Sequence, residues 1–432
     1  NTVPNDRIGL EKMRVSDGPG GVRGSKFDGP ASMNVPCGTA IAASWDTALV
    51  RDIGELLGRE VVAKGARVHL APTINLHRTP VGGRNFECMS EDPYLTAITA
   101  REYVLGVQSQ GVASCIKHFV GNDTEFERMT IDSQIDERTL REMYLLPFEH
   151  AVRDAQVMSI MTSYNRINGP YAADSTWLLR DVLRGEWKFD GMVVSDWFGL
   201  HSTVEGVVAG LDLEMPGPTL HRGDALVAAV ERGEVSADLV RDCARNILNL
   251  MERTGGTGVP PGPEISRTDA DDMATLRRAS SSAMVLLRNE SIGGTPVLPL
   301  DVRGLTSIAV LGPNASRGMV QGGGSAHVTP TRVSHPLDAI TERFGSAVRI
   351  AHSAGCNINK KLPELDARLV QNVSLDYFRD PAELDDASAV PAEAGTTGVF
   401  RLLWAGDPLN RREPNFAFGA RLAAQLTPDQ TG

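Results

Sequence analysis

The chain has 432 residues, of which 41% are hydrophobic and 22% charged, a composition that predicts a soluble globular protein with two or more domains. The net charge of −11 argues against nucleic acid or an anionic membrane as the main partner. No apolar run approaches the roughly 20 residues that a membrane-spanning helix needs.

The compartment is left open by the sequence. The chain begins at Asn1 and shows no charged and then apolar leader, which fits a cytoplasmic protein as well as a secreted protein whose signal has been removed. The five cysteines form no CxxC pair, and the nine histidines form no HxH or HExxH arrangement. We therefore expect buried thiols, no metal site and no cofactor, and a homo-oligomer stays open.

Short apolar stretches that end in polar residues recur in the N-terminal part of the chain, at 66–76, 112–120, 157–165, 191–197 and 210–216. Amphipathic helical patterns separate them, and two of these patterns begin at the predicted N-caps Asp136 and Ser175. Alternating strands and helices predict a parallel sheet. Five or more such units over residues 1–252 favour a closed, TIM-like (β/α) barrel, and an open sheet is the alternative that periodicity alone leaves open.

The composition changes after residue 252. Residues 253–272 are rich in Gly, Pro and Thr and predict a linker between domains. A helical pattern follows, and 307–316 predict a buried strand entering a turn, so we expect 273–372 to belong to a second α/β domain. The stretch "RGMVQGGGSAHV" lacks the ending of a phosphate loop and predicts a surface loop that reaches the barrel. Residues 373–432 predict the start of a third, β-rich module.

Polar residues follow the predicted strands in succession. Because the C-terminal strand ends of a barrel share one mouth, we expect these side chains to converge. They form a set of cations, two carboxylates, one tyrosine and one indole, which suits a neutral polyhydroxylated ligand. The cations are expected to lower the pKa of Asp196 and keep it ionised as a nucleophile. The members are Asp17, Arg23, Arg84, Lys117, His118, Arg128, Tyr164, Asp196 and Trp197.

Each of these residues also has a structural interpretation. Asp196 is typical of a helix cap, and Asp17 is typical of a turn. Arg84 can pair with a nearby glutamate, Tyr164 can be a core residue with a satisfied hydroxyl, and the dipeptide 117–118 can be a surface pair. The repeated placement of such residues at successive strand ends favours a functional site over these separate explanations.

Several ordered motifs resemble those of glycoside hydrolase family 3, and most closely its β-glucosidase branch. They are "SDGPGGVRG", "NLHRTPVGGRNFECMSEDP", "KHFVGN", "MTSYNRINGPYAADS" and "GMVVSDWFGLHSTVEGVVAGLDLEMPGP". The resemblance covers the chain from about residue 7 to about 350. It implies a (β/α)8 barrel followed by an α/β sandwich, with the active site between them. Residues after 373 resemble the opening of a protective-antigen-type β-sandwich that is inserted in the second domain of some members.

The resemblance also implies roles for individual residues. Asp196 falls on the nucleophile of a retaining, double-displacement mechanism, and Ser325 falls on a second-domain loop that approaches the sugar. The acid/base Glu of this branch is expected beyond residue 432. The positions that hold the terminal sugar are Asp17, Arg84, Lys117, His118, Arg128 and Tyr164, with Arg23 and Trp197 beside them.

The implied activity is that of an exo-acting β-glucosidase on terminal non-reducing β-D-glucosyl residues of a small β-glucoside or an oligosaccharide. The alternatives are a β-xylosidase or α-arabinofuranosidase of the same family, or a non-catalytic carbohydrate-binding relative. The N-acetylglucosaminidase branch is disfavoured, because Gln134 stands where that branch needs a histidine. The identity of the aglycone is left open.

Overall fold

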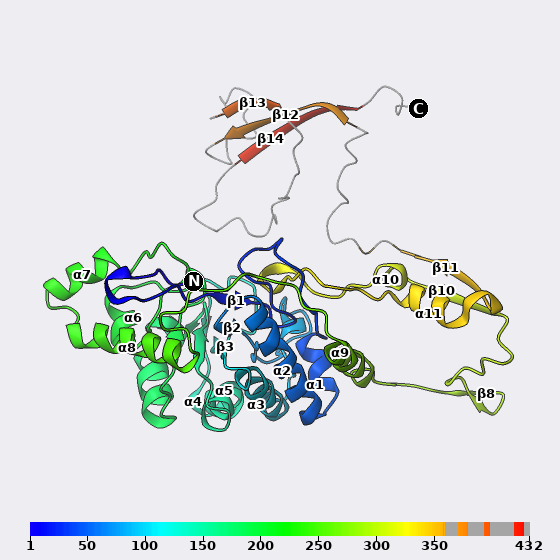
Figure 1. Ribbon diagram of the computed structural model, residues 1–432, viewed down its shortest axis with the longest axis horizontal. Coiled ribbons are helices and arrows are strands. Elements are labelled where there is room, and N and C mark those ends of the chain that lie inside the picture. Colours follow the sequence, from blue (N-terminus) through cyan, green and yellow to red (C-terminus); the bar gives the residue numbers. More distant parts are fainter. Residues whose placement is uncertain (357, 359–369, 379–392, 398–418, 427–432) are drawn as a thin grey trace. The chain divides into compact units, whose positions relative to one another are not determined.

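The computed structural model describes residues 1–356, 358, 370–378, 393–397 and 419–426 (Figure 1). The chain divides into two compact units, the first made of Asn1–Ile308 and Asn314–Ala351, the second of Ala309–Pro313 and His352–Gly432. Among the described residues, no helix has the length and apolar character needed to cross a membrane.

A sheet of five parallel strands forms the centre of the first unit, and its strands lie side by side in chain order. In the register, Asp17 lies opposite Leu70 and Met161 lies opposite Val194. The strands are β1 (Val15–Asp17), β2 (Val68–Leu70), β3 (Ala113–Phe119), β5 (Ser159–Thr162) and β7 (Met192–Val194).

Four of the five predicted strands are confirmed, because β2, β3, β5 and β7 each lie inside a predicted stretch. The fifth prediction, at 210–216, is wrong as a regular strand, since its residues contribute a single parallel bridge between Leu213 and Val194. Strand β1 is not among the predicted strands, because glycines follow Asp17 directly and make a turn the expected structure there.

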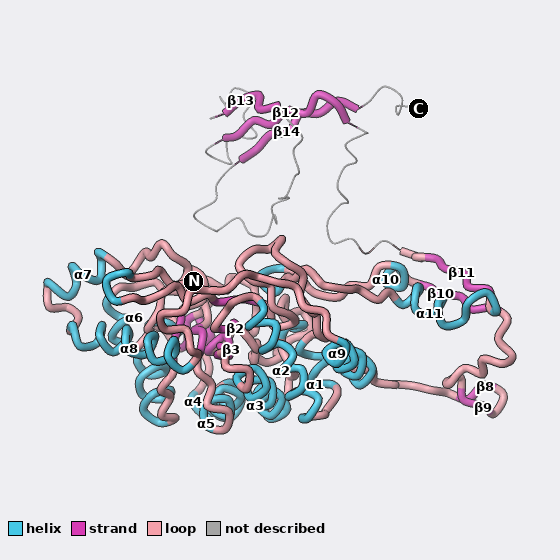
Figure 2. The backbone as a smooth tube through the Cα atoms, in the orientation of Figure 1, coloured by secondary structure: helices cyan, strands magenta, loops and turns pink. Residues whose placement is uncertain are grey.

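Helices alternate with the strands and flank them (Figure 2). Asp46 and Asp136 accept hydrogen bonds from the backbone N–H groups of Leu49 and Thr139, so Asp136 is an N-cap as predicted. Ser175 accepts from the N–H of Leu178. The helices are α1 (Gly38–Ala43), α2 (Thr47–Ala63), α3 (Pro93–Gln108), α4 (Glu137–Thr139), α5 (Leu146–Arg153), α6 (Val204–Ala209), α7 (Asp224–Glu231), α8 (Ala237–Arg253) and α9 (Ala270–Ser282), with π-helical turns η3 (Leu140–Tyr144) and η5 (Trp177–Glu186).

Both faces of the parallel sheet are buried. Ile116, Ile160 and Val193 belong to the larger core, which includes residues of the helices α2, α3 and α5. Met161 and Val194 belong to a second core on the opposite face, which residues of α8 join. This double burial explains why the strands are nearly continuous apolar runs in the sequence.

The segment after α8 is held against earlier residues of the same unit. Lys64 donates from Nζ to the carbonyl oxygen of Ile265 at 3.0 Å, and Arg59 donates to Asp272 at 2.5 Å. Helix α9 follows and places Ala279 in the larger core. The predicted helical pattern after the linker is therefore a helix, which ends at Ser282.

The strand predicted at 307–316 is present as β10 (Ser307–Leu311), but its predicted burial is wrong, since Leu311 is 77% exposed. Strand β10 pairs with β11 (Arg349–Ser353) in a two-stranded sheet, which offers less cover than the five-stranded one. The shorter elements nearby are β8 (Ser291–Ile292), β9 (Thr295–Pro296), α10 (Pro313–Ser316) and α11 (Pro336–Phe344), and β4 (Asp132–Ser133) pairs with β6 (Arg166–Ile167) near the main sheet.

The second unit contains an antiparallel sheet of β12 (Val370–Phe378), β13 (Glu393–Thr397) and β14 (Gly419–Leu426), in which β12 is central. These strands lie in the region where a β-rich module is predicted. The other parts of that prediction, at 379–392, 398–418 and 427–432, lie outside the described residues, as do 357 and 359–369 of the predicted sandwich domain. The predicted domain boundaries at 252, 272 and 372 stay predictions.

Candidate active site

The polar residues predicted to converge do lie at one edge of the parallel sheet. Asp17 ends β1, Lys117 and His118 lie near the end of β3, and Tyr164 and Asp196 follow β5 and β7. Because these strands are parallel and adjacent, their carboxyl ends share that edge. All five residues are buried or nearly so.

The two carboxylate oxygens of Asp196 have different surroundings. Its Oδ1 accepts a hydrogen bond of 2.7 Å from the backbone N–H of Trp197. Its Oδ2 is buried, and no donor among the described residues reaches it. The alternative of a helix cap is wrong, because α6 begins at Val204 with Thr203 at its N-cap position. A buried acceptor without a donor is costly, so Oδ2 is the oxygen of this carboxyl that has capacity for a further hydrogen bond.

The pKa of Asp196 contradicts the sequence prediction, because it is raised rather than lowered. Burial raises it, and the opposing effects of Arg84, Lys117 and the neighbouring N–H and hydroxyl groups are smaller. The cations are evident in the sequence, but how completely the carboxyl is removed from water depends on the folded structure. Asp196 is 7% exposed.

His118 is a neutral imidazole beside this carboxylate. Burial lowers its pKa far below the usual range, and Arg84 and Lys117 lower it further. Its Nδ1 lies 3.3 Å from Oδ1 of Asn75, and its Nε2 lies 3.2 Å from Nη1 of Arg84. With the proton assigned to Nδ1, Nε2 accepts from Arg84. The contact of 3.4 Å between Nε2 and Oδ2 of Asp196 is then no ion pair, which leaves Oδ2 free.

Asp17 and Lys117 form a buried ion pair. Oδ1 of Asp17 accepts from Nζ of Lys117 at 2.7 Å and from the backbone N–H of Gly18 at 2.9 Å. Burial acts to raise the pKa of Asp17, but Lys117 and these hydrogen bonds leave that pKa below its usual range. Asp17 is therefore a fixed carboxylate, in contrast to Asp196, and Lys117 is not a surface residue.

Arg84 satisfies both interpretations that the sequence left open. It donates to both carboxylate oxygens of Glu87, at 3.0 and 2.8 Å, so it is a structural ion-pair partner. It also reaches His118, as described above. Burial acts to lower the pKa of Arg84, yet Glu87 leaves it raised, so the guanidinium stays charged beside Asp196.

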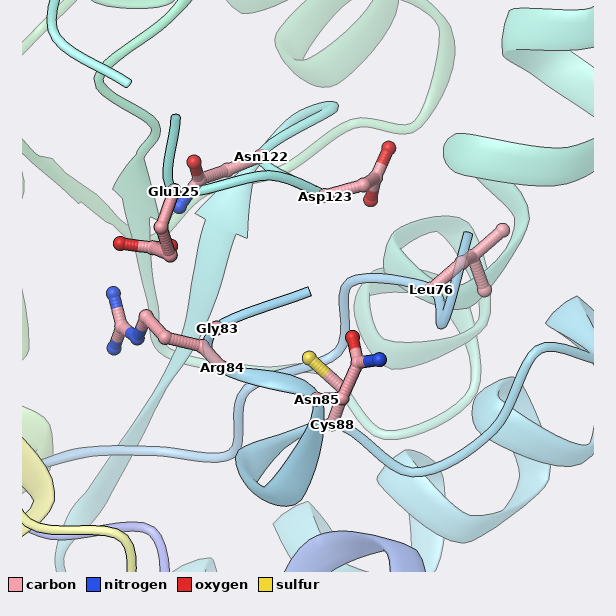
Figure 3. Close-up of a pocket in the computed structure, with 8 residues that line it drawn as sticks. All are labelled: Leu76, Gly83, Arg84, Asn85, Cys88, Asn122, Asp123 and Glu125. Carbon is pink, nitrogen blue, oxygen red and sulfur yellow. The ribbon is translucent and has the colours of Figure 1, made fainter. Parts of the chain in front are cut away.

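A small pocket is lined by Arg84 and by residues of the two loops beside it. In Figure 3 the loop with Arg84 and Cys88 faces the loop with Asn122 and Glu125 across it. The pocket does not include Asp196 itself, so it adjoins the sheet-edge site and shares Arg84 with it.

Arg128 and Tyr164 close another side of the site. The Arg128 guanidinium carbon lies 4.7 Å from the centre of the Tyr164 ring, and Nη1 donates to Glu125 at 2.7 Å. Tyr164 is 6% exposed, and burial together with Asp196 raises its pKa, so its hydroxyl stays protonated. Tyr164 is thus a buried residue, as the structural alternative proposed, and also a neighbour of the carboxylate.

Arg23 connects the loop after β1 with the loop at 317–328. Its Nη1 donates to the backbone oxygen of Ser325 at 2.7 Å, and its guanidinium carbon lies 4.1 Å from the centre of the Phe27 ring. The prediction that 317–328 is a surface loop reaching the N-terminal part is therefore confirmed. Trp197 is half-buried, and its side chain packs against the second core.

Two residues that position the site, His69 and Asn75, were missing from the predicted set, whereas Glu87 is a glutamate that the sequence predicts as a partner of Arg84. The side-chain amide of Asn75 donates to the backbone oxygen of His118 and accepts from the backbone N–H of the same residue. Nε2 of His69 lies 2.8 Å from the backbone oxygen of Gly18, in the loop next to Asp17. Asn75 follows the apolar run of β2, so the strand-end rule would have found it. His69 lies inside β2, where no sequence signal distinguishes it from a core residue.

Comparison with known proteins agrees with this architecture. The Glycosyl hydrolase family 3 N terminal domain matches residues 2–250, and the C-terminal domain of the same family matches residues 284–427. A "Beta-glucosidase" of Rhizobium radiobacter is 45% identical over all of this chain and 51% of its own length, and "Probable beta-glucosidase K" of Emericella nidulans is 39% identical over the same shares.

A solved structure of the Kluyveromyces marxianus β-glucosidase in complex with glucose has a TM-score of 0.79 at 36% identity, and covers 92% of this chain and 49% of that one. The chain thus spans about half the length of these relatives. With a family match that extends over more than half of its residues, the chain belongs to glycosyl hydrolase family 3.

Proposed function

We propose that the chain forms part of a retaining, exo-acting β-glucosidase, in which Asp196 is the nucleophile. The observation that carries this proposal is that the two carboxylate oxygens of Asp196 differ in their hydrogen bonding. The backbone of Trp197 holds Oδ1, while Oδ2 is buried without a donor at the edge where Arg84 and Lys117 supply positive charge. Relatives over the full chain that are named β-glucosidases support the same reaction.

In the proposed reaction, Oδ2 attacks the anomeric carbon of a terminal β-glucosyl residue, and the bond from that carbon to the leaving oxygen breaks. A glycosyl ester on Asp196 forms, and water then attacks the same carbon and releases glucose with its configuration retained. A second carboxyl, about 5–5.5 Å from the nucleophile, must give a proton to the leaving oxygen and later take one from water. By the family resemblance, that role falls to the acid/base Glu of the β-glucosidase branch.

The remaining residues would hold the sugar. The Asp17–Lys117 pair, Arg84, Arg128 and the neutral His118 offer fixed donors and acceptors to hydroxyl groups, and Tyr164 offers a protonated hydroxyl. We assign Arg23, Trp197 and Ser325 to the rim. The K. marxianus relative was solved with glucose, which supports a glucosyl unit over the xylosyl and arabinosyl alternatives.

We further propose that the parallel sheet belongs to a (β/α)8 barrel. Its five strands follow chain order without a reversal, so right-handed connections place every connecting helix on one face. The second core would then fill the barrel interior. By the same family resemblance, we assign the antiparallel sheet of β12, β13 and β14 to the inserted protective-antigen-type module.

The test is covalent labelling with 2,4-dinitrophenyl 2-deoxy-2-fluoro-β-glucoside, which slows hydrolysis of the glycosyl ester. Peptide mass spectrometry should find the fluoroglucosyl group on the peptide that contains Asp196, and an Asp196→Ala protein should stay unlabelled. The corresponding fluoroxyloside tests the alternative sugar. Labelling elsewhere, or near-normal turnover by Asp196→Ala, would contradict the proposal.

A further inference from the structure

The segment between α8 and α9 bonds to the loop that carries Arg23. Both carboxylate oxygens of Glu264 accept from the backbone N–H of Ser25, at 3.1 and 3.3 Å, and Oε1 also accepts from the Ser25 hydroxyl. The carboxylate lies so close to Gly24 that a Cβ there would come within 2.3 Å of Oε2. Gly24 has a φ of +86°, so this approach depends on a glycine.

A buried lysine fastens the same two segments at a second point. Nζ of Lys64 donates to the backbone oxygens of Pro30 and Ala31, at 2.6 and 2.9 Å, and to that of Ile265 at 3.0 Å. The whole Lys64 side chain is buried. Arg14 adds a contact, since it lies 3.5 Å from Glu264 and donates to the oxygen of Gly262 at 2.9 Å.

The loop that carries Arg23 is also held by two hydrogen bonds next to Asp17. The backbone N–H of Arg23 donates to the oxygen of Asp17 at 3.0 Å, and the N–H of Gly24 donates to the hydroxyl of Ser16 at 2.9 Å. Arg23 in turn donates to Ser325, and its positive charge helps to lower the pKa of Asp17. A displacement at Ser25 would therefore move Arg23 relative to both Asp17 and Ser325.

We propose that Glu264 is a positioning residue for the proposed reaction, which holds the Arg23 loop in place and so supports sugar binding at Asp17. This inference rests on the proposed function, because its effect is measured on a β-glucoside. The segment predicted as a linker is then a structural support of the site. Glu264 acts through the backbone of Ser25 and Gly24 and does not touch the sugar.

Steady-state kinetics on p-nitrophenyl β-glucoside with the intact protein test the proposal. Glu264→Ala should raise KM about tenfold with little change in kcat, because it removes charge-assisted hydrogen bonds that order a binding loop. Glu264→Gln keeps a carbonyl oxygen for Ser25 and should restore KM to within about threefold of the wild type. The control is Asp301→Ala, an exposed carboxylate that pairs with Arg303, and KM should not change.

A double-mutant cycle with Arg23 separates positioning from general destabilisation. In an Arg23→Ala background, Glu264→Ala should add less than about a twofold change in KM, because the group that it positions is already gone. The same tenfold rise in both backgrounds would overturn the proposal, as would a loss in kcat at unchanged KM.

Hydrogen exchange at residues 20–31 tests the positioning role of Glu264 without a measurement of activity. If the wild type hydrolyses no β-glucoside, the proposed function fails, but Glu264→Ala should still speed exchange at Gly24 and Ser25 and leave exchange in α3 unchanged. Unchanged exchange at Gly24 and Ser25 would contradict the positioning role whether or not the protein is active.

Discussion

Two similar apolar runs differ in solvent exposure in this protein. Met192, Val193 and Val194 form β7 and are at most 2% exposed, whereas the run Met284 to Leu287 has no regular structure and Leu287 is 92% exposed. The first run lies between two cores, one on each face of the sheet. No such layer covers the second run among the described residues. An apolar run therefore identifies a candidate for burial, and the layers around it decide whether it is buried.

The largest expected effect concerns the charged pair at the buried sheet edge. Lys117→Met leaves Asp17 buried without its counter-ion and should lower the free energy of unfolding by about 3–5 kcal/mol. Urea unfolding followed by circular dichroism measures this loss. Adding Asp17→Asn removes the uncompensated charge and should recover part of it. A loss under about 1 kcal/mol for Lys117→Met would mean that this edge is as open to water as residues 284–287.

A matched pair of leucine truncations tests the comparison directly. Leu57→Ala removes a fully buried side chain of the larger core and should cost about 2–5 kcal/mol, through lost apolar contact and a cavity. Leu287→Ala, at 92% exposure, should change the free energy of unfolding by less than about 0.5 kcal/mol. Equal losses for the two variants would show that Leu287 is buried in solution.

The pH dependence of stability reports on His69 in the sheet. Burial lowers the pKa of His69 from 6.5 to about 4. Between pH 6.5 and pH 4 the histidine is therefore protonated in the unfolded chain and neutral in the folded protein. Stability is therefore lost as the pH falls from about 6.5 to about 4, by about 2–3 kcal/mol for this group. His69→Gln keeps a donor for the Gly18 oxygen and should remove this loss.

Urea titrations of both proteins at several pH values measure the difference. Asp123 acts with the opposite sign, since burial raises its pKa to about 6, but it is present in both proteins and cancels. Parallel curves for wild type and His69→Gln would show that His69 is exposed to water.

The smallest expected effect is a single methyl group at the site. In Gly199→Ala, a Cβ would lie 3.3 Å from the backbone oxygen of Asp196, 3.4 Å from the Tyr164 ring and 3.5 Å from the Cβ of Asp196. If the proposed function holds, kcat on a β-glucoside should fall about tenfold, because a small displacement misaligns the proposed nucleophile Asp196. Gly304→Ala is the control, because nothing lies within 4 Å of the new methyl group, and kcat should not change. Equal activity in both would mean that the site edge is loosely packed.

The sequence was most informative where an apolar strand ends in a polar residue. That rule placed Lys117, Tyr164 and Asp196 at one edge, because parallel strands bring their carboxyl ends together whatever the details of packing. It was least informative about the supporting contacts. Glu264, for example, is far from Ser25 in the sequence, and a Gly- and Pro-rich segment gives no sign of which loop it will bond.

The alternation of strands and helices, the order of the motifs and the identity of the residues at strand ends were determined by the sequence alone, because they depend on local periodicity and on chain order. Tertiary structure decided the rest. It raised the pKa of Asp196 where nearby cations had predicted a lowered one, since the loss of hydration depends on every layer around the carboxyl. It also buried one apolar run and exposed its near copy, because burial needs a second surface that the run itself does not encode.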